Sequence, residues 1–199
     1  MSKKFAPATQ RNREPIRKVL EAELPEGGGL LLEIAAGTGE HAVYLSPAFP
    51  QWQWQPSDPD PDALASIAAW REEEGEDNLL PPIRLDASAA QWPVESADAM
   101  LCVNMTHISP RAASEGLFAA AGRMLPVGAP LVIYGPFIEA GVETTQSNLD
   151  FDASLKARNQ AWGLRELAWI DELAAANGLQ RTARHAMPAN NLTLVYRKS

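Results

Sequence analysis

The feature that most limits the fold of this chain is a tight glycine turn directly after an apolar run. Residues 30–36 read LLLEIAA, with the acid Glu33 inside the run, and Gly37-Thr38-Gly39 follows immediately. Residues typical of a helix start at the next position. A strand, a glycine turn and a helix in this order form the unit with which α/β folds bind nucleotide-like ligands. The sequence therefore predicts a ligand site at this turn.

Strand-like and helix-like stretches alternate along the rest of the chain. A cap residue followed by proline marks helix starts at 60–61 and 109–110, and Pro15 is expected in the first turn of the opening helix. The predicted strands are 29–35, 51–58, 82–88, 97–105, 129–137, 179–187 and 191–198, and the predicted helices are 12–24, 39–49, 60–74, 109–125 and 164–178. This order predicts one α/β domain, 1–199, with a Rossmann-like, seven-stranded, mostly parallel sheet that ends in an antiparallel pair.

Residues 139–163 form a long stretch without a clear periodicity. Long structureless connections in compact domains are usually functional or disordered. The aromatic residues and the varied composition of 147–163, SNLDFDASLKARNQAWG, argue against disorder. We therefore expect a lid or a wall of a substrate site in this segment.

The composition limits the kinds of partner and the compartment. The chain has 17 basic and 25 acidic residues, a formal net charge of −8 and a pI near 4.9, which argue against binding to a nucleic acid backbone. Its single cysteine excludes an internal disulfide framework and fits a reducing compartment. No signal peptide is recognisable, no apolar run approaches the roughly 20 residues of a membrane span, and no cluster of metal ligands stands out. We expect a cytoplasmic protein with a small-molecule substrate and without a metal.

Two kinds of ligand fit a glycine turn of this type. A dinucleotide site would use Gly37-x-Gly39-x-x-Ala42, with Asp58 as the ribose-binding acid 21 positions (58 − 37) after the first glycine. Counted from the end of the strand, however, Glu40 stands where the third small residue of that fingerprint belongs. A small nicotinamide-dependent reductase is therefore the weaker alternative.

The spacing Glu33-x-Ala35-x-Gly37-x-Gly39 resembles motif I of class I S-adenosylmethionine-dependent methyltransferases. In that motif the first small position is more often glycine than alanine. S-adenosylmethionine has no pyrophosphate but carries an ammonium group, a sulfonium group and a carboxylate. Glycines without a Cβ let the backbone approach the methionine portion, and an acid near the end of the strand serves the ammonium group. This interpretation explains Glu33, which pyrophosphate binding does not.

Further acids follow the next two predicted strands. Asp58 is expected to bind both ribose hydroxyls, while Asp86 and the backbone N–H of Ala87 hold the adenine edge. The alternatives are a turn former at Asp58 and a cap at Asp86. Because acids accompany three successive strands, the binding of S-adenosylmethionine is favoured over these alternatives. Thr38 and His41, beside the turn, complete the predicted cofactor set. His41 is expected to be structural or to lie next to the cofactor, and not to be catalytic.

Nearly the whole chain resembles one family. The matching stretches are RNREPI, GTGEH, WQPSD, NMTHISP, YGPF, SNLDFDASLKARNQAWGLRELAWI and MPANNLTL. They are similar to domain of unknown function 938, whose animal members are called methyltransferase-like protein 26. The resemblance implies a class I methyltransferase fold and brings no settled substrate. The chain departs from the family at Asn159-Gln160, where Asp-Pro is expected, and at Glu166, where Asp is expected.

Methyl transfer needs an aligned nucleophile and a place for its proton. In this fold the end of the fourth strand faces the methyl group, which points to Asn104 and His107. Asn104 is expected to contact the cofactor or the substrate. His107 is the candidate general base because the ordinary pKa of histidine lies near neutrality. The alternative is that His107 caps or packs at the next helix.

Polar and aromatic side chains elsewhere are candidates for the substrate site. They are Asn12, Tyr134, Ser147, Asn148, Arg158, Trp162, Arg165, Asn190 and Asn191. The last two also suit a plain turn, because asparagine tolerates left-handed conformations. An arginine at 158 or 165 that faces the pocket would favour an anionic substrate.

The sequence as a whole predicts methyl transfer from S-adenosylmethionine to an oxygen or nitrogen of a small acceptor, with S-adenosylhomocysteine as the product. One alternative is a protein that binds S-adenosylmethionine without catalysis, as a sensor or partner subunit. The other is the nicotinamide-dependent reductase.

Overall fold

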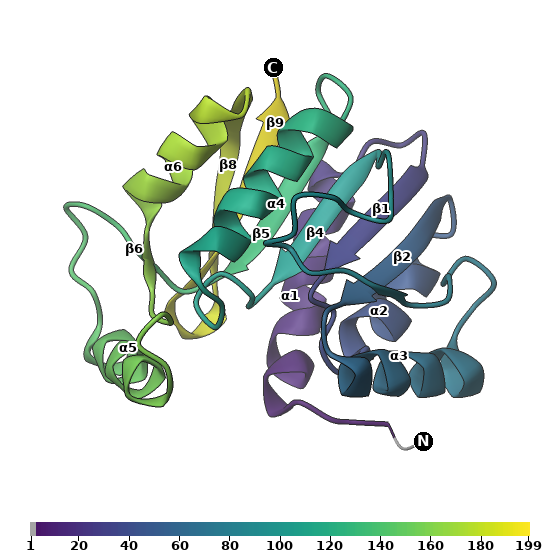
Figure 1. Cartoon of the computed structure of the whole chain (residues 1–199), viewed down its shortest axis with the longest axis horizontal. Coiled ribbons are helices and arrows are strands. Elements are labelled where there is room, and N and C mark those ends of the chain that lie inside the picture. The colour runs from purple at the N-terminus through teal and green to yellow at the C-terminus, as the bar shows by residue number, and fades with distance from the viewer. Residues whose placement is uncertain (1–2) are drawn as a thin grey trace.

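A seven-stranded sheet runs through the molecule in the order β3-β2-β1-β4-β5-β9-β8 (Figure 1). The structure, a computed structural model, describes residues 3–199. The strands of the sheet are β1 (Gly29–Ile34), β2 (Trp52–Asp58), β3 (Ile83–Arg84), β4 (Ala99–Val103), β5 (Pro130–Gly135), β8 (Leu179–Met187) and β9 (Asn191–Lys198). Strands β1 to β5 pair in parallel, and β9 runs antiparallel to both β5 and β8. The predicted fold class is confirmed.

Helices cover both faces of the sheet (Figure 1). Helices α1 (Pro7–Glu23) and α2 (Glu40–Leu45) pack on one face, with α3 (Pro61–Glu74) beside α2. Helices α4 (Arg111–Met124) and α6 (Leu167–Ala176) pack on the other face. The remaining elements are the 3-10 turns η1 (Ser46–Ala48) and η2 (Pro188–Asn190), helix α5 (Gln146–Arg158), and the short parallel pair β6 (Phe137–Ile138) and β7 (Arg165–Glu166). None of the helices within residues 3–199 has the length and apolarity that crossing a bilayer requires.

Strand β4 shows why the central strands read as continuous apolar runs. All of its residues are buried, and they alternate between the two layers of the core. Leu101 and Val103 belong to the apolar cluster that includes α1, whereas Met100 and Cys102 belong to the cluster that includes α4. A parallel strand buried on both faces needs apolar side chains at every position.

Helix α1 begins earlier than the sequence predicted. It starts at Pro7, which lies in its first turn, so Pro15 lies inside the helix and the expectation for Pro15 was wrong. The added residues 7–11 carry no apolar stripe, and the one among them that is buried is the polar Thr9. The hydrophobic pattern therefore could not reveal them.

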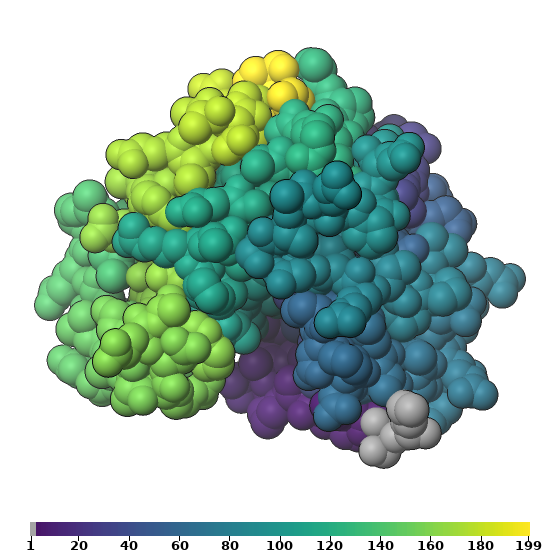
Figure 2. Space-filling model, viewed as in Figure 1, coloured from purple at the N-terminus to yellow at the C-terminus, as the bar shows by residue number. Residues whose placement is uncertain are grey.

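The lack of periodicity in segment 139–163 suggested a stretch without regular structure, but the segment does contain regular structure. It contains helix α5, on which only Asn148 and Leu155 are buried. A helix with so little apolar burial shows no clear apolar stripe in the sequence. Figures 1 and 2 show this region in green at one side of the molecule, where it borders the purple residues of α1 in the space-filling view.

Candidate functional site

The glycine turn between β1 and α2 holds three residues in the left-handed region. Ala35 has φ 55°, Gly37 has φ 60° and Gly39 has φ 90°. This conformation costs residues with a Cβ about 1–2 kcal/mol, so Ala35 is strained at the position where motif I more often has glycine. The turn is fastened to the neighbouring strand, because the Ala36 N–H donates to the Ser57 carbonyl at 2.9 Å.

The two glycines of the turn face different surroundings. A Cβ built on Gly39 would lie 2.8 Å from the Cα of Ile67, so this glycine allows α3 to pack against the turn. A Cβ built on Gly37 meets no atom of the described residues within 4 Å. The backbone at Gly37 is therefore open to a ligand, and Gly39 serves packing.

Glu33 is a buried carboxyl group, and one of its two oxygens has a hydrogen-bond partner. It is 1% exposed, and its Oε2 accepts a bond of 2.7 Å from Trp54 Nε1. Its Oε1 is buried and has no hydrogen-bond partner within residues 3–199. Burial raises the pKa of Glu33 to about 7. The hydrogen bond from Trp54 opposes this rise, and the charge of Asp58 adds a smaller rise. A buried polar atom without a partner is unfavourable, which suits a site that a cationic ligand completes.

Asp58 ties the end of β2 to the glycine turn. Its Oδ2 accepts the Gly37 N–H at 2.9 Å, and its Oδ1 accepts the Asp60 N–H at 2.9 Å. Burial raises the pKa of this carboxyl group, and the two backbone donors oppose the rise. Each carboxylate oxygen keeps capacity for a second donor, so Asp58 can shape the turn and still bind hydroxyl groups.

Asp86 and Ala87 follow β3, at the same edge of the sheet. Asp86 Oδ1 accepts both the backbone N–H of Ser88, at 2.8 Å, and its hydroxyl, at 2.7 Å. These bonds lower the pKa of Asp86. The predicted turn-capping role is therefore present, and Oδ2 is the oxygen that a ligand can reach. Ala87 packs closely on α4, since a Cβ on Gly116 would lie 1.9 Å from the Ala87 carbonyl oxygen.

His41 and Thr38 attach α1 and the N-terminal segment to the turn. His41 Nε2 lies 2.8 Å from Asn12 Oδ1, and burial, with the nearby charge of Arg13, lowers the pKa of His41 to about 4. The neutral ring donates from Nε2 to this amide oxygen. Thr38 donates its hydroxyl to Glu40 at 3.0 Å. Both residues therefore hold the turn in place.

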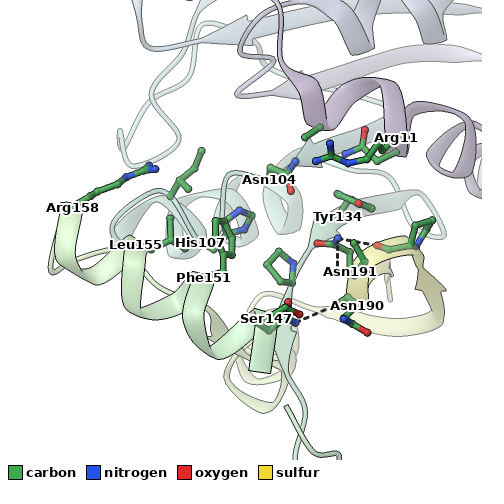
Figure 3. Close-up of a pocket in the computed structure, with 17 residues that line it drawn as sticks. Arg11, Asn104, His107, Tyr134, Ser147, Phe151, Leu155, Arg158, Asn190 and Asn191 are labelled. Atoms are coloured by element: carbon green, nitrogen blue, oxygen red, sulfur yellow. Dashed lines mark hydrogen bonds between the residues drawn. The ribbon is translucent and has the colours of Figure 1, made fainter. Parts of the chain in front are cut away.

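A cavity of about 570 Å³ opens at the ends of β4 and β5, between α1, α5 and η2 (Figure 3). Of the predicted site residues, it is lined by Asn104, His107, Asn12, Tyr134, Ser147, Asn148, Arg158, Asn190 and Asn191. Segments far apart in the sequence line this cavity, and two of them are joined directly, because the Asn148 Nδ2 on α5 donates to the Asn190 carbonyl in η2 at 3.2 Å.

Trp162 and Arg165 are not among the lining residues of this cavity. The Arg165 guanidinium donates to backbone carbonyls of Thr106 at 2.9 Å, Ser109 at 2.6 Å and Ala161 at 3.0 Å. It holds the loop after β4 and does not face the substrate space that the sequence suggested. Trp162 lies under Arg158, with the guanidinium carbon 5.0 Å from the ring centre, and so positions that arginine.

His107 is enclosed, and no acidic group supports it. It is 3% exposed, it packs edge-on against Phe151 at 5.6 Å between ring centres, and its Nδ1 is buried without a partner in the described chain. Burial, followed by the positive charge of Arg165, lowers the pKa of His107 to about 4. The ring is neutral at pH 7 but binds an incoming proton weakly.

Strained backbone gathers at the turn and the cavity. The non-glycine residues with positive φ in the described chain are Ala35 in the turn and Asn104, Ala189 and Asn190 around the cavity. Asn104, with φ 61°, is held there by its N–H bond to the Tyr134 carbonyl at 2.9 Å. Strain of this kind clusters at functional sites.

The sequence analysis missed several residues of the cavity. They are Ala8, Ile108, Phe151, Leu155, Pro188 and Ala189. One signal was available, because positions 148, 151, 155 and 158 follow a helical spacing. This face is directed at a cavity and is only partly apolar, so it did not stand out.

The family described as "Protein of unknown function (DUF938)" matches residues 3–198. Among solved structures, an O-methyltransferase family 2 protein from Planctomyces limnophilus in complex with apigenin is 20% identical, with a TM-score of 0.76 and 95% of this chain and 62% of that chain covered. An O-methyltransferase family protein from Burkholderia thailandensis is 17% identical, with a TM-score of 0.80 over 96% and 57%. Human N-acetylserotonin methyltransferase in complex with S-adenosylmethionine is 12% identical, with a TM-score of 0.76 over 96% and 53%.

The chain thus spans between 53% and 62% of the length of these three proteins. At such low identities the similarity shows the fold. It is the Rossmann-like fold of class I methyltransferases, with the seven-stranded sheet described above.

Proposed function

The chain belongs to the DUF938 family, and from this premise and its fold we propose that it transfers a methyl group from S-adenosylmethionine to a small-molecule acceptor. A fold alone does not determine a function, so the proposal depends on the site. The observation that carries it is the combination at the glycine turn of an open backbone at Gly37, an unpartnered buried oxygen on Glu33 and the carboxylate of Asp58.

The residues at the turn fit the chemical groups of S-adenosylmethionine. Glu33 Oε1 would accept from the ammonium group, and the open backbone at Gly37 would lie against the methionine portion. Asp58 would bind the ribose hydroxyls with the remaining capacity of its oxygens. Asp86 and Ala87 would hold the adenine. The solved structure of human N-acetylserotonin methyltransferase with S-adenosylmethionine supports this choice of cofactor by its shared fold.

The cofactor supplies a methyl group activated by an adjacent sulfonium. The chain supplies position and shelter for the acceptor. Asn104, in its strained conformation at the end of β4, lies at the border between the turn and the cavity, and Tyr134 lies beside it. Helix α5 and η2 line the far side of the cavity, where they would shelter the reacting atoms from part of the solvent.

A nicotinamide cofactor suits this turn poorly. A pyrophosphate binds where backbone N–H groups and positive charge face it. Here the turn lies next to the carboxyl groups of Glu33 and Asp58, and Asp58 already accepts the Gly37 N–H. A carboxylate beside a pyrophosphate is repulsive, whereas a carboxylate beside an ammonium group is attractive.

A turnover experiment tests the proposal. The purified protein is incubated with S-adenosylmethionine labelled in its methyl group and a small-molecule cell extract, and S-adenosylhomocysteine and labelled products are measured. We expect protein-dependent product formation that Gly37→Ala abolishes. Cofactor binding without any turnover would instead support the non-catalytic alternative, and the absence of binding would end the proposal.

A further inference from the structure

The cavity at the ends of β4 and β5 carries positive charge in a protein that is acidic overall. Arg11 from α1 and Arg158 from α5 line it, and none of its lining residues in the described chain is acidic. The whole chain has a formal net charge of −8. A cavity with two guanidinium groups and no carboxylate is therefore a local exception, which favours an anionic ligand.

Neither arginine is neutralised by the protein. The ion pairs within residues 3–199 engage other arginines, Arg17, Arg181, Arg184 and Arg197, and neither Arg11 nor Arg158. In Figure 3 the two side chains lie on opposite sides of the cavity, with Asn104 and His107 between them. Arg158 is positioned by its contact with the Trp162 ring at 5.0 Å. Guanidinium groups bind carboxylates with charge-assisted hydrogen bonds.

No carboxylate of the described chain lines the cavity to take a proton from the acceptor, and His107 is its one imidazole. Alcohol and amine acceptors must lose a proton during methyl transfer, which a general base normally accepts. His107 lacks an acidic partner, and burial together with Arg165 lowers its pKa to about 4. Burial raises the pKa of Tyr134, so its hydroxyl stays protonated. An acceptor that arrives as an anion needs no such base.

We propose that the methyl acceptor is a small organic acid with an apolar body, that the positive charges of Arg11 and Arg158 attract its carboxylate into the cavity, and that a carboxylate oxygen receives the methyl group. Ile108, Phe151 and Leu155 line the same cavity and provide the surface for the apolar body. This inference rests on the proposed methyltransferase function and specifies its substrate class.

The reaction balances without a proton. A carboxylate oxygen uses a lone pair to form the bond to the methyl carbon, while the carbon–sulfur bond breaks and its electron pair remains on sulfur. The negative charge of the acid and the positive charge of the sulfonium cancel. The products are a methyl ester and S-adenosylhomocysteine, so the cavity has no need of a base.

Binding provides a test that is independent of turnover. The protein saturated with S-adenosylhomocysteine is titrated calorimetrically with 4-phenylbutyrate and with the neutral 4-phenylbutanamide, which has a similar shape. We expect the acid to bind about tenfold more tightly or better, the range of a charge-assisted pair. Arg11→Met and Arg158→Met should each remove most of this preference, and Arg158→Lys should restore part of it.

A control matched for charge separates a local effect from a general one. Lys18 lies on α1, is exposed and does not line the cavity, so Lys18→Met should keep the full preference for the acid. Both arginines are exposed, and thermal melting should show that their variants fold normally. An equal affinity for acid and amide, or a preference lost equally in Lys18→Met, would overturn the inference.

The chemistry of the product is the second test. Aryl-alkyl acids, their amides, the corresponding amines and phenols, and phenyl phosphate are compared as acceptors. We expect turnover only with the acids and release of methanol from the product in mild alkali. Faster methylation of a phenol, an amine or the phosphate would exclude the carboxylate while leaving the methyltransferase function in place. Failure of S-adenosylhomocysteine to bind at all would end the proposed function itself.

Discussion

The two halves of the ligand-binding edge are built in different ways. The cofactor half consists of the ends of β1, β2 and β3 and the turn before α2, all within residues 29–88. The acceptor half brings together α1, the loop after β4, α5 and η2, which are spread from residue 7 to residue 190. Residues that are close together in the sequence form the first half, whereas segments that are far apart in the sequence form the second. Under the proposed function, this difference means that cofactor binding would follow from the fold and acceptor choice from the segments placed around it.

The glycines of the turn offer the largest expected effects. Gly37→Ala places a Cβ into space that no described residue occupies, so the fold should survive with about 1–2 kcal/mol of left-handed strain. Its affinity for S-adenosylhomocysteine should fall by about a hundredfold or more, because the Cβ occupies the ligand's space. Gly39→Ala should instead lower the melting temperature strongly, since its Cβ would lie 2.8 Å from the Ile67 Cα. Equal behaviour of the two variants in calorimetry and melting would contradict the division of roles.

Asp58→Asn should weaken cofactor binding and the turn together. The substitution leaves one acceptor oxygen where two backbone N–H groups now bind, at Gly37 and Asp60. We expect about 1–3 kcal/mol of lost stability and at least a tenfold loss of affinity. Urea unfolding and calorimetry measure the two effects. An unchanged affinity of the variant for S-adenosylhomocysteine would show that Asp58 does not bind the cofactor.

In the acceptor half, His107→Asn distinguishes two mechanisms. A general base contributes about 10²- to 10⁴-fold to the rate. If the acceptor is a carboxylate, kcat with 4-phenylbutyrate should change by less than about tenfold, provided that melting shows a normal fold. A loss within the general-base range would assign proton transfer to His107 and contradict the organic-acid inference.

Glu33 links cofactor binding to pH. Burial holds its pKa at about 7, so the carboxyl group is protonated below that pH in the free protein, and an ammonium group beside it favours ionisation. Binding of S-adenosylhomocysteine at pH 6 should therefore release a proton, and affinity should rise with pH up to about 7, by at most about tenfold per pH unit. Calorimetry in buffers of different ionisation enthalpy measures this release, and Glu33→Gln should abolish it. Uptake of a proton when S-adenosylhomocysteine binds would contradict this prediction.

The same raised pKa affects the free protein. Glu33 contributes fully to the free energy of unfolding below pH 4.5, the ordinary pKa of the group. This contribution is lost as the pH rises through about 7, because Glu33 ionises at a lower pH in the unfolded state than in the folded state. The ligand-free wild type should therefore lose more stability between these pH values than Glu33→Gln does, as urea unfolding would show. Identical pH dependence in the two proteins would mean that Glu33 is not protonated at low pH in the folded state.

The smallest effect is expected at Ala35. Glycine there relieves left-handed strain of about 1–2 kcal/mol but adds about 0.5–1 kcal/mol of chain entropy in the unfolded state. Ala35→Gly should raise the free energy of unfolding by up to about 1.5 kcal/mol without changing cofactor affinity. Urea unfolding and calorimetry test both parts, and destabilisation would mean that the Ala35 side chain contributes packing that outweighs the strain.

The strands and the turn of the proposed cofactor half could be predicted from the sequence because their signals are local. Apolar runs such as β4, buried on both faces, and the spacing from Glu33 to Gly39 stand within short windows. Strands β8 and β9 also match their predicted ranges, because a short link joins two clear strand patterns. The alternation of strands and helices was therefore enough to predict the sheet, and the structure confirms it.

The acceptor half could be predicted only in part. Polar side chains such as Tyr134 and Asn148 were expected in the substrate site and do line the cavity, but the helix that carries Asn148 was missed, since its inner face borders a cavity and not the core. Arg165 looked like a substrate ligand because a sequence does not reveal that three backbone carbonyls bind its guanidinium. Two of these contacts join residues that are 59 and 56 positions apart in the sequence.

Calorimetric titration of the purified protein with S-adenosylhomocysteine, alongside NADH, tests the central claim most directly. The claim is that the turn around Gly37, together with Glu33 and Asp58, binds S-adenosylmethionine or its product S-adenosylhomocysteine. We expect saturable binding at a single site, about micromolar in affinity, and no saturable binding of NADH. Tight NADH binding, or no heat with S-adenosylhomocysteine up to about millimolar concentration, would contradict the account.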